Sequence, residues 1–249
     1  MASTSQESTA PGTPKKPPGS RPRISGVKQA FATVIVGEAK AEFVVHEALL
    51  THYSEFFRAA LLGRFQEAET KTVTLKDQNP VTFEIFIHWL YHQRFPHAGY
   101  GDDKDLVALY GDPMAENGVS ADAHRTKTQV LVRLYVFGDA HQAVRFKNDA
   151  LRTLFAHLNG KKHHVPCPST YTYAFSRLAN TDALCRLLVD HHCLRTTSYS
   201  CDVDDGNCPF DTNFLFEVAK RWVCLVHGKP QTNVYSYSLT MTDYVVKAM

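Results

Sequence analysis

Residues 43–62, FVVHEALLTHYSEFFRAALL, decide the fold. An extended start at Phe43 ends at His46, and apolar side chains then recur at the spacing of a helix. The apolar stripe comprises Val45, Leu49, Tyr53, Phe56, Phe57, Ala60 and Leu61. Polar side chains occupy the opposite face, so the stretch predicts a helix of about five turns whose stripe is buried against other elements. We expect the His46 side chain to satisfy backbone groups where the strand ends and the helix begins.

The segments on either side of this helix predict a small sheet. Residues 32–37, ATVIVG, are rich in β-branched side chains, and residues 41–45 follow after a short polar link. This pattern predicts a hairpin with Gly37 at or near its turn. Residues 71–75, KTVTL, alternate between polar and apolar and predict a third strand.

Further helices are predicted downstream of the sheet. Residues 77–80, DQNP, are typical of a helix cap with proline at the first helical position. Apolar side chains at helical spacing follow at Phe83, Phe86, Ile87, Leu90 and Tyr91. The same spacing predicts helices over residues 128–140, 146–158, 171–179, 183–192 and 213–226. Thr181 and Asp182 are expected to cap the helix over residues 183–192.

Residues 97–125 interrupt the helical pattern. They contain four glycines and an acidic cluster at residues 102–105, DDKD. We expect an insertion loop that is mobile or partly helical around residues 105–110. The glycines lack the preceding strand and the Gly-Lys-Ser/Thr sequence of a phosphate-binding loop. The acidic cluster lacks the spaced oxygen ligands and the terminal glutamate of a calcium loop.

The order of these patterns over residues 31–158 resembles a BTB/POZ domain of the fungal type. Residues 63–68, GRFQEA, match a G-x-F-x-E-A turn, and residues 89–91, WLY, match the end of a helix of this family. The resemblance implies an α+β fold in which a small three-stranded sheet is flanked by a helical cluster. It also implies a helical C-terminal extension. We expect a disordered tail at 1–23, which is too polar to offset its ordering entropy, the BTB/POZ domain at 24–158 and the extension at 159–249.

The resemblance implies a protein–protein interaction module that mediates oligomerisation, including a homodimer. Some members are substrate adaptors that dock a cullin scaffold of ubiquitin ligases, and a hydrophobic-x-Glu triplet after the long helix takes part in that docking. Phe65 and Glu67 match the triplet and are the expected partner-binding residues. The alternative is that Phe65 belongs to the core. A rival function is a non-enzymatic scaffold or transcription-associated interaction protein unrelated to ubiquitin.

The start of the first strand departs from the pattern of many animal members. Those proteins carry an aspartate there, which belongs to a charged pocket at their dimer groove. This sequence has Phe31, Ala32 and Thr33 instead. The departure argues against an animal-type groove and against corepressor binding through it.

Composition and charge exclude several function classes. The 249 residues carry a net charge of +2, so no global field directs the chain to nucleic acid or to acidic membranes. No apolar run approaches the roughly 18 residues of a membrane helix, and the N-terminus lacks the apolar region of a secretion signal. We therefore expect protein partners, no nucleic acid and no membrane. Reduced thiols and a cytoplasmic or nuclear location are also expected.

The chemistry-bearing residues form no recognisable catalytic pattern. Motifs of nucleophilic and zinc-dependent hydrolysis are missing from the sequence, and the carboxylate pairs lie in polar stretches where nothing raises a pKa. We expect no enzyme activity, no catalytic residue, no cofactor and no metal. Cys193, Cys201 and Cys208 with a histidine are an alternative zinc site, but their gaps of seven and six residues exceed the usual spacing of about two to four. The other interpretation is free thiols near a polar loop.

Overall fold

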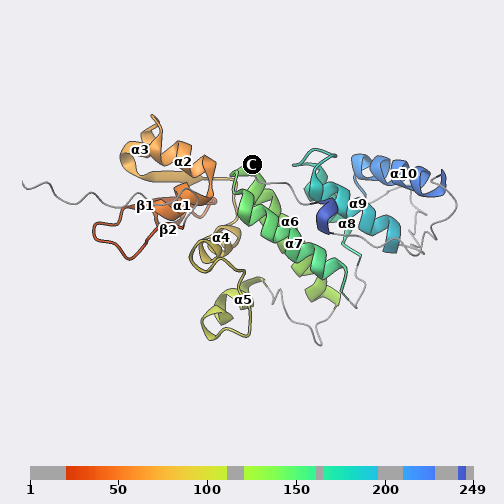
Figure 1. Cartoon of the computed structure of the whole chain (residues 1–249), viewed down its shortest axis with the longest axis horizontal. Helices are drawn as coiled ribbons and strands as arrows, with labels where there is room; N and C mark the ends of the chain where they lie inside the picture. The colour runs from red at the N-terminus through yellow and green to blue at the C-terminus, as the bar shows by residue number, and fades with distance from the viewer. Residues whose placement is uncertain (1–20, 111–120, 161–164, 196–209, 228–240, 245–249) are drawn as a thin grey trace, which may run out of the picture.

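The structure, a computed structural model, describes residues 21–110, 121–160, 165–195, 210–227 and 241–244. The elements in chain order are β1 Phe31–Val36, β2 Ala41–His46, α1 Glu47–Tyr53, α2 Glu55–Leu62, α3 Gln66–Thr70, β3 Thr72–Leu75, α4 Pro80–His92, η1 Gly101–Asp103, α5 Lys104–Tyr110, α6 Ala121–Ala140, α7 Val144–Leu158, α8 Pro168–Phe175, α9 Ala183–Arg195, α10 Thr212–His227 and η3 Met241–Asp243. Figure 1 shows the sheet with α1–α3 at one end, α6 and α7 in the middle, and α8–α10 at the other end. Most of the expected disordered tail, residues 1–20, lies outside the described residues.

The three strands form one mixed sheet in the order β2-β1-β3. β1 is antiparallel to β2, with Val34 opposite Phe43, and parallel to β3, with Val34 opposite Val73. Gly37 follows β1 with a φ of 73°, a left-handed backbone that favours glycine and lets the chain turn back into β2. The α+β fold, the hairpin with its glycine turn and the third strand are confirmed.

Aromatic side chains from α2, α4, α6 and α7 fill the core. Phe57, Phe86, Phe137 and Phe146 are all buried. The ring centroid of Phe86 lies 5.2 Å from that of Phe137 and 5.0 Å from that of Phe146. Ring pairs at such distances contribute about 0.5–1.5 kcal/mol each beyond the burial of their area. These contacts hold α6 and α7 against α4.

The prediction of one five-turn helix is wrong, because the stretch forms α1 and α2, which are separated at Ser54. The backbone of Ser54 is extended, with φ −136° and ψ 122°, and this ends α1. The Ser54 hydroxyl donates to the carbonyl oxygen of His141 over 2.6 Å and accepts a hydrogen bond from the N–H of Phe57 over 3.2 Å. One side chain thus caps α2 and binds the turn between α6 and α7. Periodicity misses the break because the apolar stripe continues through it.

The expectation for His46 is also wrong. Its side chain makes no hydrogen bond to the backbone of α1. Instead, its Nδ1 lies 2.6 Å from the hydroxyl of Tyr91, which also accepts the His46 backbone N–H over 3.3 Å. The Phe31 ring packs against the His46 ring with centroids 4.5 Å apart. His46 therefore ties the start of α1 to α4.

A carboxylate at the start of α9 joins the C-terminal helices to α6 and α7. Asp182 caps α9 as predicted, accepting the N–H of Leu184 over 2.8 Å. The same carboxylate accepts the hydroxyl of Tyr135 over 2.8 Å and the ammonium of Lys147 over 3.3 Å. Asp182 therefore fixes where α9 begins relative to the middle of the molecule. The expected domain boundaries at 23/24 and 158/159 stay predictions.

Replacing Ser54 by alanine is expected to lower the free energy of unfolding by about 2–3 kcal/mol, because it removes a helix cap and leaves the buried His141 carbonyl unpaired. Urea unfolding of the full chain measures this change. Thr51→Ala is the matched control, because the Thr51 hydroxyl bonds to the Glu47 carbonyl within α1. The control is expected to change the free energy by less than about 0.5 kcal/mol. Equal losses in both variants would contradict the role given to Ser54.

Candidate partner-binding site

The turn between α2 and α3 presents the two residues that the sequence predicts to bind a partner. α2 ends at Leu62, and the Gly63 N–H donates to the carbonyl oxygen of Ala59 over 3.0 Å. A Cβ on Gly63 would lie 2.2 Å from the same oxygen, so the turn has no room for a side chain there. α3 begins directly after Phe65. Figure 1 places this turn at the opposite end of the molecule from α10.

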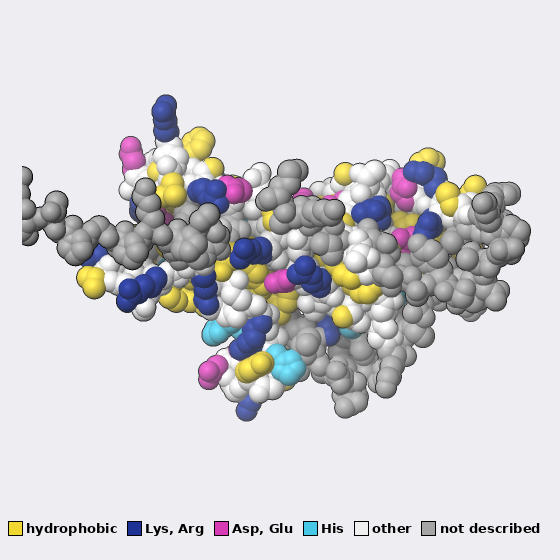
Figure 2. Space-filling model, in the orientation of Figure 1, with side chains coloured by type: hydrophobic (Ala, Val, Ile, Leu, Met, Phe, Trp, Pro, Cys, Tyr) yellow, Lys and Arg dark blue, Asp and Glu magenta, His cyan; other side chains and the backbone are white. Residues whose placement is uncertain are grey.

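Phe65 lies at the surface rather than in the core. Its exposed fraction is 61%, and that of Leu62 is 58%. The ring atom Cδ2 of Phe65 is 3.4 Å from the place that a Gly63 Cβ would take, so the ring rests on the glycine backbone. Figure 2 shows hydrophobic side chains at the surface over α2 and α3, with acidic and basic side chains beside them.

Glu67 lies half-buried in the first turn of α3, where the helix dipole favours a carboxylate. The end of α3 is held by Lys71, whose backbone is left-handed with φ 53°. Its ammonium donates to the Leu61 carbonyl over 2.9 Å and to the Glu47 carboxylate over 3.2 Å. These bonds fasten α3 to α1 and α2. We refer to Leu62, Phe65 and Glu67 as the Phe65 surface.

A second pair of exposed apolar side chains lies on β1 and β2. The exposed fraction is 68% for Val44 and 48% for Phe31. β2 is at the edge of the sheet. An edge strand offers backbone N–H and C=O groups for pairing with another chain. This region is therefore suited to contact between two protein chains.

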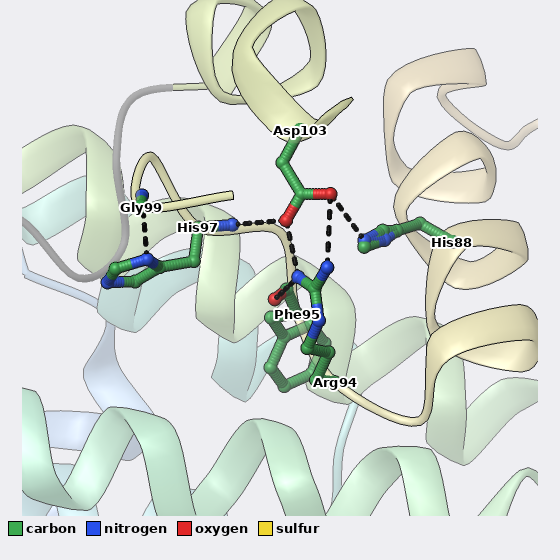
Figure 3. Close-up of polar contacts among 6 residues, drawn as sticks. All are labelled: His88, Arg94, Phe95, His97, Gly99 and Asp103. Carbon is green, nitrogen blue, oxygen red and sulfur yellow. Dashed lines mark hydrogen bonds and ion pairs between the residues drawn. The ribbon is translucent and has the colours of Figure 1, made fainter. Parts of the chain in front are cut away.

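A buried carboxylate holds the described start of the insertion against α4, as Figure 3 shows. Asp103 of η1 forms an ion pair with the guanidinium of Arg94 and accepts the N–H of His97 over 2.9 Å. The Nε2 atom of His88 in α4 lies 3.3 Å from the same carboxylate. η1 and α5 confirm the helical part predicted here, whereas α6 begins at Ala121 instead of at residue 128. Sequence reasoning missed the Arg94–Asp103 contact.

The two titratable side chains at the centre of this contact have shifted pKa values. Burial acts to raise the pKa of the Asp103 carboxyl, but the hydrogen bonds from Arg94 and His97 outweigh it, so the pKa lies below its ordinary value. Burial, together with the neighbouring His92, lowers the pKa of His88 from 6.5 to about 4. His88 is therefore neutral at pH 7, and its Nε2–H donates to the charged Asp103.

The described residues contain neither a metal-binding cluster nor a membrane-spanning helix. Within the described ranges, no group of three or more His, Cys, Asp or Glu side chains is arranged to hold a metal ion. Cys193 is buried, and burial raises the pKa of its thiol to about 12. Cys201 and Cys208, the other two cysteines of the alternative zinc site, lie outside the described residues. Among the helices that the structure describes, none combines the length and apolar character needed to cross a bilayer.

Comparison with known proteins identifies the segment that carries the Phe65 surface. Residues 28–110 match the family model of the BTB/POZ domain. This segment is a BTB/POZ domain. It contains the sheet, α1–α5 and the turn at Phe65. A BTB/POZ domain is a protein–protein interaction module. The fungal subtype stays a prediction.

Two curated relatives match about a quarter of the chain. "BTB and MATH domain-containing protein 15" of Caenorhabditis elegans is 33% identical over 64 residues, which is 26% of this chain and 23% of the nematode protein. "Kelch repeat and BTB domain-containing protein 4" of Homo sapiens is 28% identical over 65 residues, which is 26% of this chain and 12% of the human protein. The match therefore spans less than a quarter of the length of either relative.

The pKa of His88 predicts a pH dependence of stability. The unfolded chain binds a proton at this position below about pH 6.5, whereas the folded chain binds it only below about pH 4. The contribution of neutral His88 to the free energy of unfolding is thus fully present above about pH 6.5 and is lost as the pH falls toward 4. The expected loss is about 2 kcal/mol between pH 7 and pH 5.

Urea unfolding of wild type and His88→Gln at both pH values checks this prediction. The variant is expected to lose the His88 contribution and to show a smaller drop between the two pH values. Burial also lowers the pKa values of His141 and His192, so both proteins keep some of the pH dependence. The same drop in both proteins would show that His88 does not titrate as described.

Proposed function

We propose that this protein is a non-enzymatic adaptor that docks a cullin scaffold through the Phe65 surface and binds a second protein elsewhere on the chain. The proposal rests on the 61% exposure of Phe65 on a turn that the packing of Gly63 fixes. The BTB/POZ domain supports the proposal because it is an interaction module.

The Phe65 surface has the composition of a small interface centre. Fully burying a phenylalanine side chain contributes about 1.5–3 kcal/mol. Leu62 extends the apolar area beside Phe65, and Glu67 lies at its margin. Aromatic anchors in the centre of an interface supply most of its affinity, while charges at the rim govern orientation and association rate. Phe65 is accordingly the anchor, and Glu67 selects a basic partner group.

Self-association is a second candidate function, which the exposed side chains of Phe31 and Val44 favour. Two copies joined through β2 would bury both side chains in a two-fold interface. Such a dimer does not need the aspartate that many animal members carry before the first strand.

A scaffold or transcription-associated interaction protein unrelated to ubiquitin is the alternative that applies when no cullin is bound. It uses the same BTB/POZ domain with a different partner. The cytoplasm or the nucleus remains the predicted compartment.

Phe65→Ala is expected to weaken binding to the N-terminal domain of a cullin at least about tenfold, because about 1.5–3 kcal/mol of apolar burial is lost. Isothermal titration calorimetry with the full chain gives the Kd. Since Phe65 is exposed, the melting temperature should change by less than about 3 °C.

Val44→Ala is the matched control, because Val44 is as exposed as Phe65 but lies on β2. It should leave the Kd for cullin unchanged. A Phe65→Ala variant that binds like wild type, or that unfolds, shows that Phe65 is not the docking residue. If the wild-type chain binds no cullin, the adaptor function is refuted and the scaffold function is the one that applies.

Val44→Asp is expected to convert a dimeric chain into a monomer, because each copy would place a charge in the apolar interface. Light scattering coupled to size exclusion measures the molar mass. Phe65→Ala should remain dimeric in the same experiment. A monomeric wild type would refute self-association and leave the cullin proposal untouched.

A further inference from the structure

A cavity of about 480 Å³ lies where the turn before α4 meets α6 and α8. Its volume falls within the range of about 300–1,000 Å³ that is typical of ligand pockets. The cavity is thus formed jointly by the BTB/POZ domain and by helices that follow it. Its lining includes the charged residues Asp77, Arg133, Asp139 and Arg177 and the aromatic residue Tyr173.

Two arginines share one aromatic ring in this cavity. The Cζ atom of Arg177 lies 4.1 Å from the ring centroid of Tyr173, and that of Arg133 lies 5.9 Å from it. Arg133 comes from α6, whereas Tyr173 belongs to α8 and Arg177 lies two residues after the end of that helix. A guanidinium that stacks on a ring keeps its N–H groups available at its edge. The Tyr173 ring therefore keeps the two positively charged guanidinium groups, both hydrogen-bond donors, close together.

Neither guanidinium pairs with a carboxylate in the described part of the chain. Arg177 donates to the hydroxyl of Ser176 over 3.1 Å. Arg133 makes a cation–π contact with the ring of Tyr173. Arg94, by contrast, is neutralised by Asp103. Because Arg133 and Arg177 line a cavity without a protein carboxylate bound to them, they are suited to an acidic group from outside.

The carboxylates of the cavity limit the charge of such a group. Asp139 is paired with the ammonium of Lys147 over 2.6 Å, and Asp77 lines the cavity from the turn before α4. With Asp139 paired to Lys147, the two arginines and Asp77 leave a net charge of +1 in the cavity. One carboxylate balances this charge, whereas a doubly charged phosphate exceeds it. A carboxylate can also accept two parallel N–H bonds from a guanidinium. The lining therefore favours the side chain of aspartate or glutamate over a phosphorylated residue.

A shallow hollow of about 650 Å³ continues from the cavity along α8. It shares Tyr173 and Arg177 with the cavity and adds Ser169, Thr172 and Ser176. Thr172 and Ser176 follow Ser169 by about one and two helical turns. The three residues therefore lie on one side of α8 and of the residue that ends it. Their hydroxyl oxygens can accept hydrogen bonds from the N–H groups of an extended peptide. We refer to the cavity and the hollow together as the α8 groove.

We propose that the α8 groove binds an extended segment of another protein that carries an aspartate or a glutamate. The side-chain carboxylate enters the cavity and accepts hydrogen bonds from Arg133 and Arg177. The backbone of the segment follows the hydroxyl groups of α8. This site uses none of the residues of the Phe65 surface and does not require that a cullin be bound.

A display library of random peptides of about ten residues, which span about 33 Å when extended, tests the proposal without a known ligand. The library is panned against the full wild-type chain. Recovered peptides are expected to contain Asp or Glu at one position at least about threefold more often than the library does, because charge-assisted bidentate bonds select a carboxylate.

Panning is repeated with two double variants. Arg133→Gln with Arg177→Gln should abolish the acidic preference. Arg145→Gln with Arg152→Gln is the matched control, which removes two exposed arginines from α7 and should preserve the preference. All four side chains are exposed, so both double variants should melt like wild type.

A recovered peptide is then synthesised with glutamate, glutamine or phosphoserine at the enriched position and titrated by calorimetry. The glutamate peptide is expected to bind at least about tenfold more tightly than the glutamine peptide and at least as tightly as the phosphoserine peptide. The Phe65→Ala variant should bind it like wild type, which separates this site from cullin docking.

In the peptide experiments, any of three outcomes overturns the proposal: no acidic preference, a preference that survives in the Arg133/Arg177 variant, or tighter binding of phosphoserine. A short single-stranded RNA that binds the wild type but not this variant also overturns it, because the arginines would then serve phosphates rather than a protein carboxylate.

Discussion

One buried hydroxyl connects two distant parts of the core. Ser54 donates to the carbonyl of His141, 87 positions later in the chain. Both residues are buried, so either group would be costly to leave without its partner. His141 is itself held in place, because its Nδ1 bonds to the Phe137 carbonyl over 2.8 Å and its ring stacks on Phe137 with centroids 4.1 Å apart. The direction of α2, and with it the turn that exposes Phe65, therefore depends on the turn between α6 and α7.

The sequence predicts those features of the fold that depend on neighbouring residues. Gly37 marks the hairpin because its φ of 73° is a local requirement. Asn79 marks the start of α4 because its side chain accepts the N–H groups of Val81 and Thr82. The break at Ser54 could not be predicted in this way, since its acceptor comes from a distant turn and the apolar stripe runs on through it. The sequence therefore predicted the order of the elements better than the joint between α1 and α2.

Contacts between distant residues also limit what the sequence predicts about the candidate sites. A phenylalanine after a helix suits the core and the surface equally, so the sequence named Phe65 and Glu67 but left the place of Phe65 open. The close packing of Gly63 against Ala59 is what puts Phe65 outside. Arg133 and Arg177 belong to no motif, because only folding brings α6 and the end of α8 to the same ring. Pairings of this kind arise from tertiary structure and leave no local pattern.

The bond between Ser54 and His141 also bears on how the chain is synthesised. The segment that matches the BTB/POZ family ends at residue 110, before His141. A ribosome adds about 5–20 residues per second, so roughly 4–17 s pass between the synthesis of the donor and that of its acceptor. During this time the aromatic faces of α2 and α4 lack the helices that cover them in the finished protein. Transiently exposed apolar surface makes a nascent chain prone to aggregation, so we expect this chain to be most vulnerable before the turn between α6 and α7 has been made.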